Sequence, residues 1–161
     1  MYEIEIANEQ ASLTIDEDRI RRVAETVLEA EQIDRAVISI AIVDDATLRQ
    51  LNVRHLNHDY DTDVLSFLLE SESADVDSSD DPAAPRGRGL RIEGEVIASA
   101  DMACRMAVEY QWRPIDELTL YVVHGLLHLA GYDDLTDSER DIMRRREREI
   151  LSQLGLSATE R

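Results

Sequence analysis

Two histidines and an aspartate form a group whose residue types and spacing suit metal chemistry. His124 and His128 are four residues apart, which places both imidazoles on one face of an α-helix, one turn apart. Two ring nitrogens so placed can bind one metal ion at about 2.0–2.1 Å each. Asp134 can supply a third ligand and leave the fourth position to water, as in catalytic zinc sites. The sequence therefore predicts one divalent metal, zinc in first place, and identifies no catalytic residue beyond the bound water.

The segment that carries the two histidines has the signals of a buried helix. Pro114 suits the first helical position, and Asp116 and Glu117 suit the first turn. Apolar residues then cover most of its circumference: Leu118, Leu120, Val122, Val123, Leu126, Leu127 and Leu129. Imidazoles on such a helix need polar partners, which favours a metal-binding role over a chance pair. Gly131 can end the helix in the left-handed conformation, so that the chain turns and brings Asp134 toward the histidines.

The remaining pattern predicts an α+β fold, with a small mixed β-sheet of about four strands packed with about five helices in a single domain over residues 1–161. Strands are expected over residues 2–7, 35–43, 64–69 and 90–98. Helices are expected after a capping box at residues 14–17, after Asp44 and Asp45, and over residues 99–111, 114–129 and 136–154. The β-branched run at 35–43 predicts a central strand covered on both faces. Polar and small residues at about 71–89 predict a mobile surface loop.

Composition restricts the class of protein. The chain has 161 residues, 43% of them hydrophobic, which is enough for a core without disulfides. Cys104 is the only cysteine, which excludes an internal disulfide and favours the cytoplasm, and it is expected to be inert core. The N-terminus lacks a signal-peptide profile, and no apolar run is long enough to span a membrane. Lysine is absent, which excludes Schiff-base and P-loop chemistry.

The net charge of −18 argues against general nucleic-acid binding. Salt screens exposed charges beyond roughly 8 Å, so a local arginine patch can still meet a phosphate. Two groups of arginines are candidates. The first, on the last predicted helix, has acidic neighbours that favour a solvated helix surface, whereas the second flanks the predicted loop and is better placed to follow flexible RNA. They are Arg144, Arg145, Arg146 and Arg148 in the first group, and Arg86, Arg88 and Arg91 in the second.

The stretch His124 to Asp134, H-G-L-L-H-L-A-G-Y-D-D, resembles the signature H-G-x-L-H-L-x-G-Y-D-H of the YbeY family of bacterial endoribonucleases. A second block over residues 51–67 is similar to the family's L-N…D-x-P-T-[DN]-V-L-S-F, and residues 94–97 stand where the family has G-D-[LIV]-V. The resemblance covers roughly residues 38–155. Three departures bear on the function: Asp134 stands at the family's third histidine, Leu56 at its arginine, and Asp61 at the proline before its threonine.

The resemblance implies a metal-dependent endoribonuclease that prefers single strands and acts in rRNA maturation and ribosome quality control, with ribosomal RNA and the ribosome as partners. The alternative is a ribosome-associated assembly or binding factor with a structural metal, which the acidic charge and Leu56 favour. A hydrolase of another substrate, such as peptide, ranks third. The metzincin protease pattern H-E-x-x-H-x-x-G-x-x-H needs a glutamate base where this chain has Gly125.

Several roles stay open at the level of the sequence. Asp133, Asp63 or a group of the substrate could serve as general base, and Asp133 could equally fix the turn through backbone amides. His55 and His58 are expected to be solvated or structural. Ser66 could bond a phosphate or the backbone. The sequence makes no prediction of the oligomeric state.

Overall fold

The computed structural model describes residues 1–73 and 81–157. Within them it confirms the α+β fold, with a four-stranded mixed sheet and five helices. The strands are β1 (Tyr2–Glu9), β2 (Arg35–Val43), β3 (Val64–Ser73) and β4 (Leu90–Ser99). The helices are α1 (Glu17–Ala30), α2 (Asp45–Leu56), α3 (Ala100–Tyr110), α4 (Pro114–Leu129) and α5 (Asp137–Gln153). Element types therefore follow the sequence prediction, and the ends of most elements differ by only a few residues.

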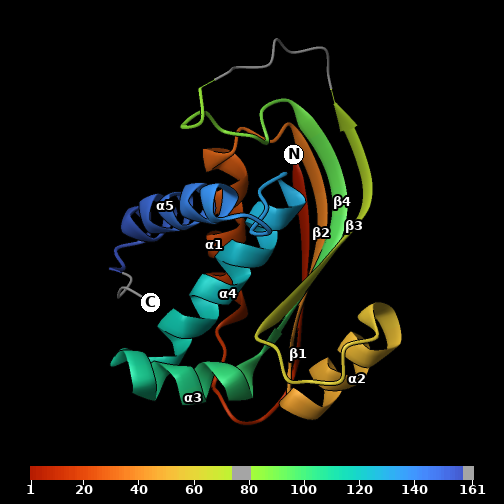
Figure 1. Ribbon diagram of the computed structural model, residues 1–161, viewed down its shortest axis with the longest axis vertical. Coiled ribbons are helices and arrows are strands. Elements are labelled where there is room, and N and C mark those ends of the chain that lie inside the picture. Colours follow the sequence, from red (N-terminus) through yellow and green to blue (C-terminus); the bar gives the residue numbers. More distant parts are fainter. Residues whose placement is uncertain (74–80, 158–161) are drawn as a thin grey trace.

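The sheet has the strand order β1-β2-β4-β3. β1, β2 and β4 run parallel, whereas β3 pairs antiparallel with β4. Helices α1, α4 and α5 lie on one side of the sheet, and α2 lies on the other (Figure 1). The main core fills the space between the inner face of the sheet and these three helices, with α4 at its centre. This arrangement places the histidine helix against β3 and β4.

The central position of β2 is confirmed, but the prediction that it is covered on both faces is wrong. Its residues alternate between buried and exposed over most of its length, and Val37 on the outer face is 38% exposed. Only its C-terminal end is covered on the outer face, where Val43 packs in a small cluster with Leu48 of α2 and Leu65 of β3. The β-branched run therefore reflects strand propensity more than burial on two faces.

The helix starts follow ordinary capping chemistry, with one difference from the prediction. Asp16, rather than Thr14, caps α1, because its side chain accepts from the amides of Asp18 and Arg19. Asp44 caps α2, as the sequence predicted, and Thr136 caps α5. An aspartate two residues closer to the helix replaces the expected capping box.

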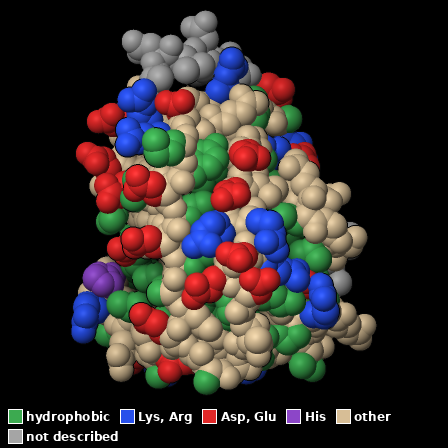
Figure 2. All heavy atoms as spheres, turned by 180° about the vertical axis from the view of Figure 1, so that it is seen from behind, with side chains coloured by type: hydrophobic (Ala, Val, Ile, Leu, Met, Phe, Trp, Pro, Cys, Tyr) green, Lys and Arg blue, Asp and Glu red, His purple; other side chains and the backbone are tan. Residues whose placement is uncertain are grey.

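The segment predicted as a mobile loop at about 71–89 differs at both ends. Residues 71–73 belong to β3, and the backbone of Arg86 and Gly87 bonds to a buried carboxylate of α1. The central part of that prediction, residues 74–80, lies outside the described residues. None of the described helices combines the length and the apolar character needed to cross a membrane. Seen from behind, acidic side chains spread over the surface with arginines among them (Figure 2).

Candidate metal centre

Helix α4 presents His124 and His128 at the border of the core, with about a quarter of each side chain exposed. Between them, Gly125 faces the sheet, where an added Cβ would lie 2.7 Å from Cγ1 of Val96. The helix therefore lies directly against β4 at this point, and a larger residue at position 125 would push it away. A glutamate base of the metzincin kind has no room there.

The turn after α4 delivers the third candidate ligand. Gly131 has φ +104°, and the amide of Tyr132 bonds back to the carbonyl of Leu127 at 3.0 Å, which closes the helix with a glycine-dependent cap. Asp133 then accepts from the amide of Asp134 at 2.7 Å. This bond supports the turn-fixing role for Asp133. The predicted Gly131 turn is confirmed, and it carries Asp134 back over the histidines.

His124, His128 and Asp134 form what we call the histidine–aspartate cluster. The two Nε2 atoms lie 3.0 Å apart, and Oδ2 of Asp134 lies 3.5 Å from Nε2 of His124 and 3.7 Å from Nε2 of His128. One donor atom from each residue lies within 4.8 Å of the other two. Two imidazole nitrogens and a carboxylate oxygen form a donor set typical of catalytic zinc.

The other ring nitrogens fix the chemistry of this cluster. Nδ1 of His128 donates to the carbonyl of Tyr132 at 3.1 Å, because a carbonyl can only accept. Nδ1 of His124 lies 2.5 Å from Oε1 of Glu147 and donates to that carboxylate. In neutral rings both Nε2 atoms then carry lone pairs, which face each other and Asp134. Three electron-pair donors this close repel one another unless a proton or a metal cation lies between them.

The electrostatics of His124 agree with this geometry. Desolvation is the largest single influence and lowers its pKa, but the hydrogen bond and charge of Glu147, with the charges of Asp63 and Asp134, outweigh it. The net pKa of His124 is raised above 6.5. The cluster therefore attracts positive charge, as a metal centre must, and a metal would compete with a proton there.

A pocket of about 270 Å³ opens beside the cluster. Its polar lining consists of His124, Asp134, Asp63, Glu147, Arg140 and Arg144. Asp63 stands at the start of β3, where its Oδ1 accepts from the amide of Val64 at 2.8 Å. The pKa of Asp63 is raised, mainly because the surrounding protein removes water, although the nearby His124 opposes the shift. Asp63 is thus a carboxyl group with enhanced proton affinity beside the candidate metal ligands.

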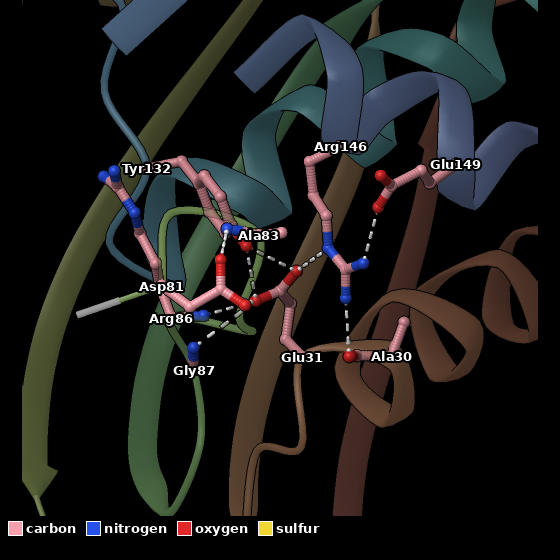
Figure 3. Close-up of polar contacts among 9 residues, drawn as sticks. All are labelled: Ala30, Glu31, Asp81, Ala83, Arg86, Gly87, Tyr132, Arg146 and Glu149. Atoms are coloured by element: carbon pink, nitrogen blue, oxygen red, sulfur yellow. Dashed lines mark hydrogen bonds and ion pairs between the residues drawn. The ribbon is translucent and has the colours of Figure 1, made fainter. Parts of the chain in front are cut away.

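A second polar group, the Glu31 cluster, is made of Glu31, Tyr132, Arg146 and the backbone of Arg86 and Gly87 (Figure 3). Glu31 is fully buried. It accepts from Nε of Arg146 at 2.6 Å, from the Tyr132 hydroxyl at 3.0 Å and from the amide of Arg86 at 3.0 Å. Desolvation and the charge of Glu31 raise the pKa of Tyr132 to about 12. Tyr132 belongs to both groups, since its carbonyl holds His128.

The arginines considered as RNA contacts in the sequence analysis have different environments in the structure. Arg146 is 13% exposed and bonds Glu31, so the solvated-surface interpretation is wrong for this residue. Arg86 pairs with Glu139 at 2.8 Å and lies over the Tyr132 ring, so its guanidinium is engaged by protein. Arg91 pairs with Asp34. Arg144 lines the pocket, and it is joined there by Arg140, which sequence reasoning did not select.

Other predicted residues lie away from this pocket. His55 contacts the ring of Phe67 edge-on, and His58 bonds the hydroxyl of Tyr60, so both have the structural contacts that were expected. Ser66 is half-buried on β3, and Leu56 is 45% exposed at the end of α2. None of these four residues is part of the pocket lining.

Glu147 is a residue of the site that sequence reasoning missed. A signal for it existed, because Glu147 lies four residues after Met143, three before Ile150 and four before Leu151, which are the buried side chains of α5. A glutamate on the buried face of a helix needs a partner, which here is His124. The carbonyl of Tyr132 has no sequence signal, since any residue would supply it.

Comparison with known proteins identifies the family of the chain. The sequence profile of the family described as Endoribonuclease YbeY matches residues 5–155. The chain belongs to this family. It is 38% identical over 150 residues to Endoribonuclease YbeY of Salinibacter ruber, which covers 92% of this chain and 90% of that protein. It is 36% identical over 158 residues to that of Moorella thermoacetica, which covers 96% of this chain and 98% of that protein.

A solved structure also resembles the chain. The solution structure of TM1509 from Thermotoga maritima has a TM-score of 0.55 at 20% identity, over 94% of this chain and 91% of that one. This similarity shows the shared fold. The relatives therefore support the family, while the roles of single residues depend on the geometry above.

Proposed function

We propose that this protein is a zinc-dependent endoribonuclease that cleaves single-stranded ribosomal RNA during rRNA maturation and ribosome quality control. Its relatives are described as endoribonucleases. The observation that carries the proposal is the convergence of His124, His128 and Asp134 on one point beside an open pocket. The proposal places the protein in the cytoplasm, with ribosomal RNA and the ribosome as partners.

The three residues would hold the metal, with Glu147 and the Tyr132 carbonyl fixing the two imidazoles. A zinc ion supplies Lewis-acid chemistry there: it acidifies water and polarises a phosphoryl oxygen. Asp134 makes the donor set more anionic than three histidines would. An oxygen ligand also makes the site more tolerant of manganese or magnesium.

Asp63 is the strongest candidate for general base. It lines the pocket with His124, and its raised pKa makes it a better proton acceptor than an ordinary aspartate. One of its carboxylate oxygens accepts from the Val64 amide, which orients the group. Glu147 is less suitable, because its carboxylate is engaged by His124, and Asp133 is engaged by the turn.

The test is cleavage of a single-stranded rRNA fragment by purified protein with and without added zinc. Wild-type protein should cut the RNA only with metal, and Asp63→Asn should retain full metal content while losing most activity. Metal-replete wild-type protein that leaves the RNA intact would overturn the proposal. In that case, ribosome association together with a lower Tm after metal removal would identify an assembly factor with a structural metal.

A further inference from the structure

We propose that Arg140 and Arg144 form a phosphate-binding subsite that holds the RNA backbone next to the metal centre. This inference rests on the proposed function, because it names the residues that would hold the substrate in the same pocket. Both guanidinium-bearing side chains line that pocket together with His124 and Asp134. Arginine suits this ligand, because its planar fork matches the oxygens of a phosphodiester group.

The two arginines share one face of α5. They are four residues apart, which places their Cβ atoms about 5–6 Å from each other on the helix surface. From that face they flank the pocket on the side of α5, while His124 flanks it from α4. An RNA strand that brings one phosphate group to the metal would therefore place its neighbouring phosphate group beside Arg140 and Arg144.

Both side chains are available to a ligand. Arg144 is exposed and forms no hydrogen bond or ion pair with another residue of the described ranges. Arg140 donates to Asp137 at 2.8 Å, but 40% of the Arg140 side chain and 97% of the Asp137 side chain are exposed. Arg140 also donates to the carbonyl of Asp134, at the long distance of 3.5 Å. Exposed pairs such as Arg140–Asp137 contribute little, so Arg140 can exchange Asp137 for a phosphate at small cost.

The contrast with the neighbouring arginine supports the assignment. Arg146, two residues beyond Arg144, is turned inward and held by Glu31. Arg145 and Arg148 are exposed and do not line the pocket. In a chain with a net charge of −18, long-range attraction of RNA is unfavourable, so binding must depend on direct contacts of this kind. The arginine pair supplies such contacts beside the metal ligands.

The test compares two double variants on the same helix. The probe is a fluorescein-labelled ten-nucleotide 2′-O-methyl phosphorothioate RNA, which keeps the backbone charge and resists cleavage. Its affinity for zinc-loaded wild-type, R140Q/R144Q and R145Q/R148Q protein is measured by anisotropy over a range of salt concentrations. Both variants lose two positive charges, so a difference in their affinity for the probe shows that the position of the arginines on the helix matters.

We expect R140Q/R144Q to bind the probe at least about tenfold more weakly than R145Q/R148Q, with a salt slope smaller by about 1.4, since each phosphate contact on a single strand contributes about 0.7. Zinc content and Tm should equal those of the wild type. In cleavage assays KM should rise more than kcat falls. Equal affinity and salt slope in the two variants would overturn the subsite.

The outcomes also separate this inference from the proposed function. Wild-type protein that binds the probe through the pair but never cleaves RNA would leave the subsite standing and overturn the nuclease. Cleavage that is unaffected in R140Q/R144Q would leave the nuclease standing and overturn the subsite. A wild-type protein that does not bind the probe would overturn the subsite as well.

Discussion

The histidine–aspartate cluster and the Glu31 cluster are connected through Tyr132, whose carbonyl bonds His128 and whose hydroxyl bonds Glu31. They satisfy their polar groups in opposite ways. In the Glu31 cluster, a fully buried carboxylate meets a guanidinium, a hydroxyl and two backbone amides. In the histidine–aspartate cluster, two imidazole nitrogens and a carboxylate oxygen face one another beside a pocket, and a proton or a metal cation must lie between them. The first cluster is complete within the protein, while the second has donor atoms that either a proton or a metal ion can occupy. The fold is thus held by the satisfied group, and ligand binding is left to the unsatisfied one.

The largest expected effect is on metal binding and comes from His128→Ala. The change removes one of the two proposed imidazole ligands, so zinc content should fall from about one per chain to nearly none. RNA cleavage should fall by more than about 100-fold, the upper limit of the effect expected for losing a residue that only orients a ligand. Mass spectrometry of the metal and a cleavage assay measure the two effects. Because the side chain is a quarter exposed, the Tm of the metal-free protein should fall by no more than about 2–4 °C. A larger fall would place His128 in the framework of the fold.

The next effect is on stability and comes from Glu31→Gln. The amide keeps the shape but leaves the Arg146 guanidinium without its buried anion, so the free energy of unfolding should fall by about 3 kcal/mol. This corresponds to a Tm lower by about 6–12 °C for a chain of this size. Urea denaturation of the zinc-loaded protein measures it. Glu149→Gln is the matched control, because Glu149 also bonds Arg146 but is 45% exposed, and it should cost no more than about 0.5 kcal/mol.

Glu147→Gln tests the hydrogen bond between His124 and the carboxylate of Glu147. We expect zinc affinity at pH 8 to fall by about 10–100-fold, as is typical when the partner of a metal-binding histidine is changed, with the Tm of the metal-free protein less affected than in Glu31→Gln. Competition with a chromogenic chelator measures the affinity. Unchanged affinity would mean that Glu147 only packs beside His124.

The same variant should change the pH dependence. Because the folded pKa of His124 lies above 6.5, its contribution to the stability of the metal-free protein is complete below pH 6.5 and is lost as the pH rises through the raised pKa. Zinc affinity has the opposite dependence and falls as the pH falls through that pKa, since a proton then occupies the imidazole. In Glu147→Gln the pKa of His124 should be lower than in the wild type. The loss of stability and the gain in zinc affinity with rising pH should therefore both occur at lower pH.

The smallest expected effect comes from Asp134→His, which creates a third imidazole at the position where the family signature has histidine. Zinc binding should persist, with an affinity within about tenfold of the wild type and a weaker response to manganese, since imidazole favours zinc and carboxylate favours harder ions. Metal titration in the presence of both ions measures the preference. If this variant loses its metal, the turn at Gly131 cannot position a ring there.

Much of the fold and the centre of the site could be predicted from the sequence, because both depend on local patterns. The spacing of His124 and His128 and the cap at Gly131 are local, and the structure brings them together as expected. The inward turn of Arg146 could not be predicted, since its partner Glu31 lies 115 residues away and nothing local marks either one. The placement of Arg140 and Arg144 at the pocket could not be predicted either. Five arginines lie close together in this part of the sequence, and only the packing of α5 beside α4 determines which of them border the pocket.

The Glu31 cluster has a further consequence for the lifetime of the native state. Its contacts join residues 101 and 115 positions apart, so they form only after α1, the turn after α4 and α5 have come together. We expect these polar side-chain contacts to form late in folding, because all three segments must be docked before the hydrogen bonds can be made. Interactions that are absent from the folding transition state mainly slow unfolding and leave the folding rate almost unchanged. Glu31 therefore determines how long the protein stays folded more than how fast it folds, and so how long the metal centre keeps its shape.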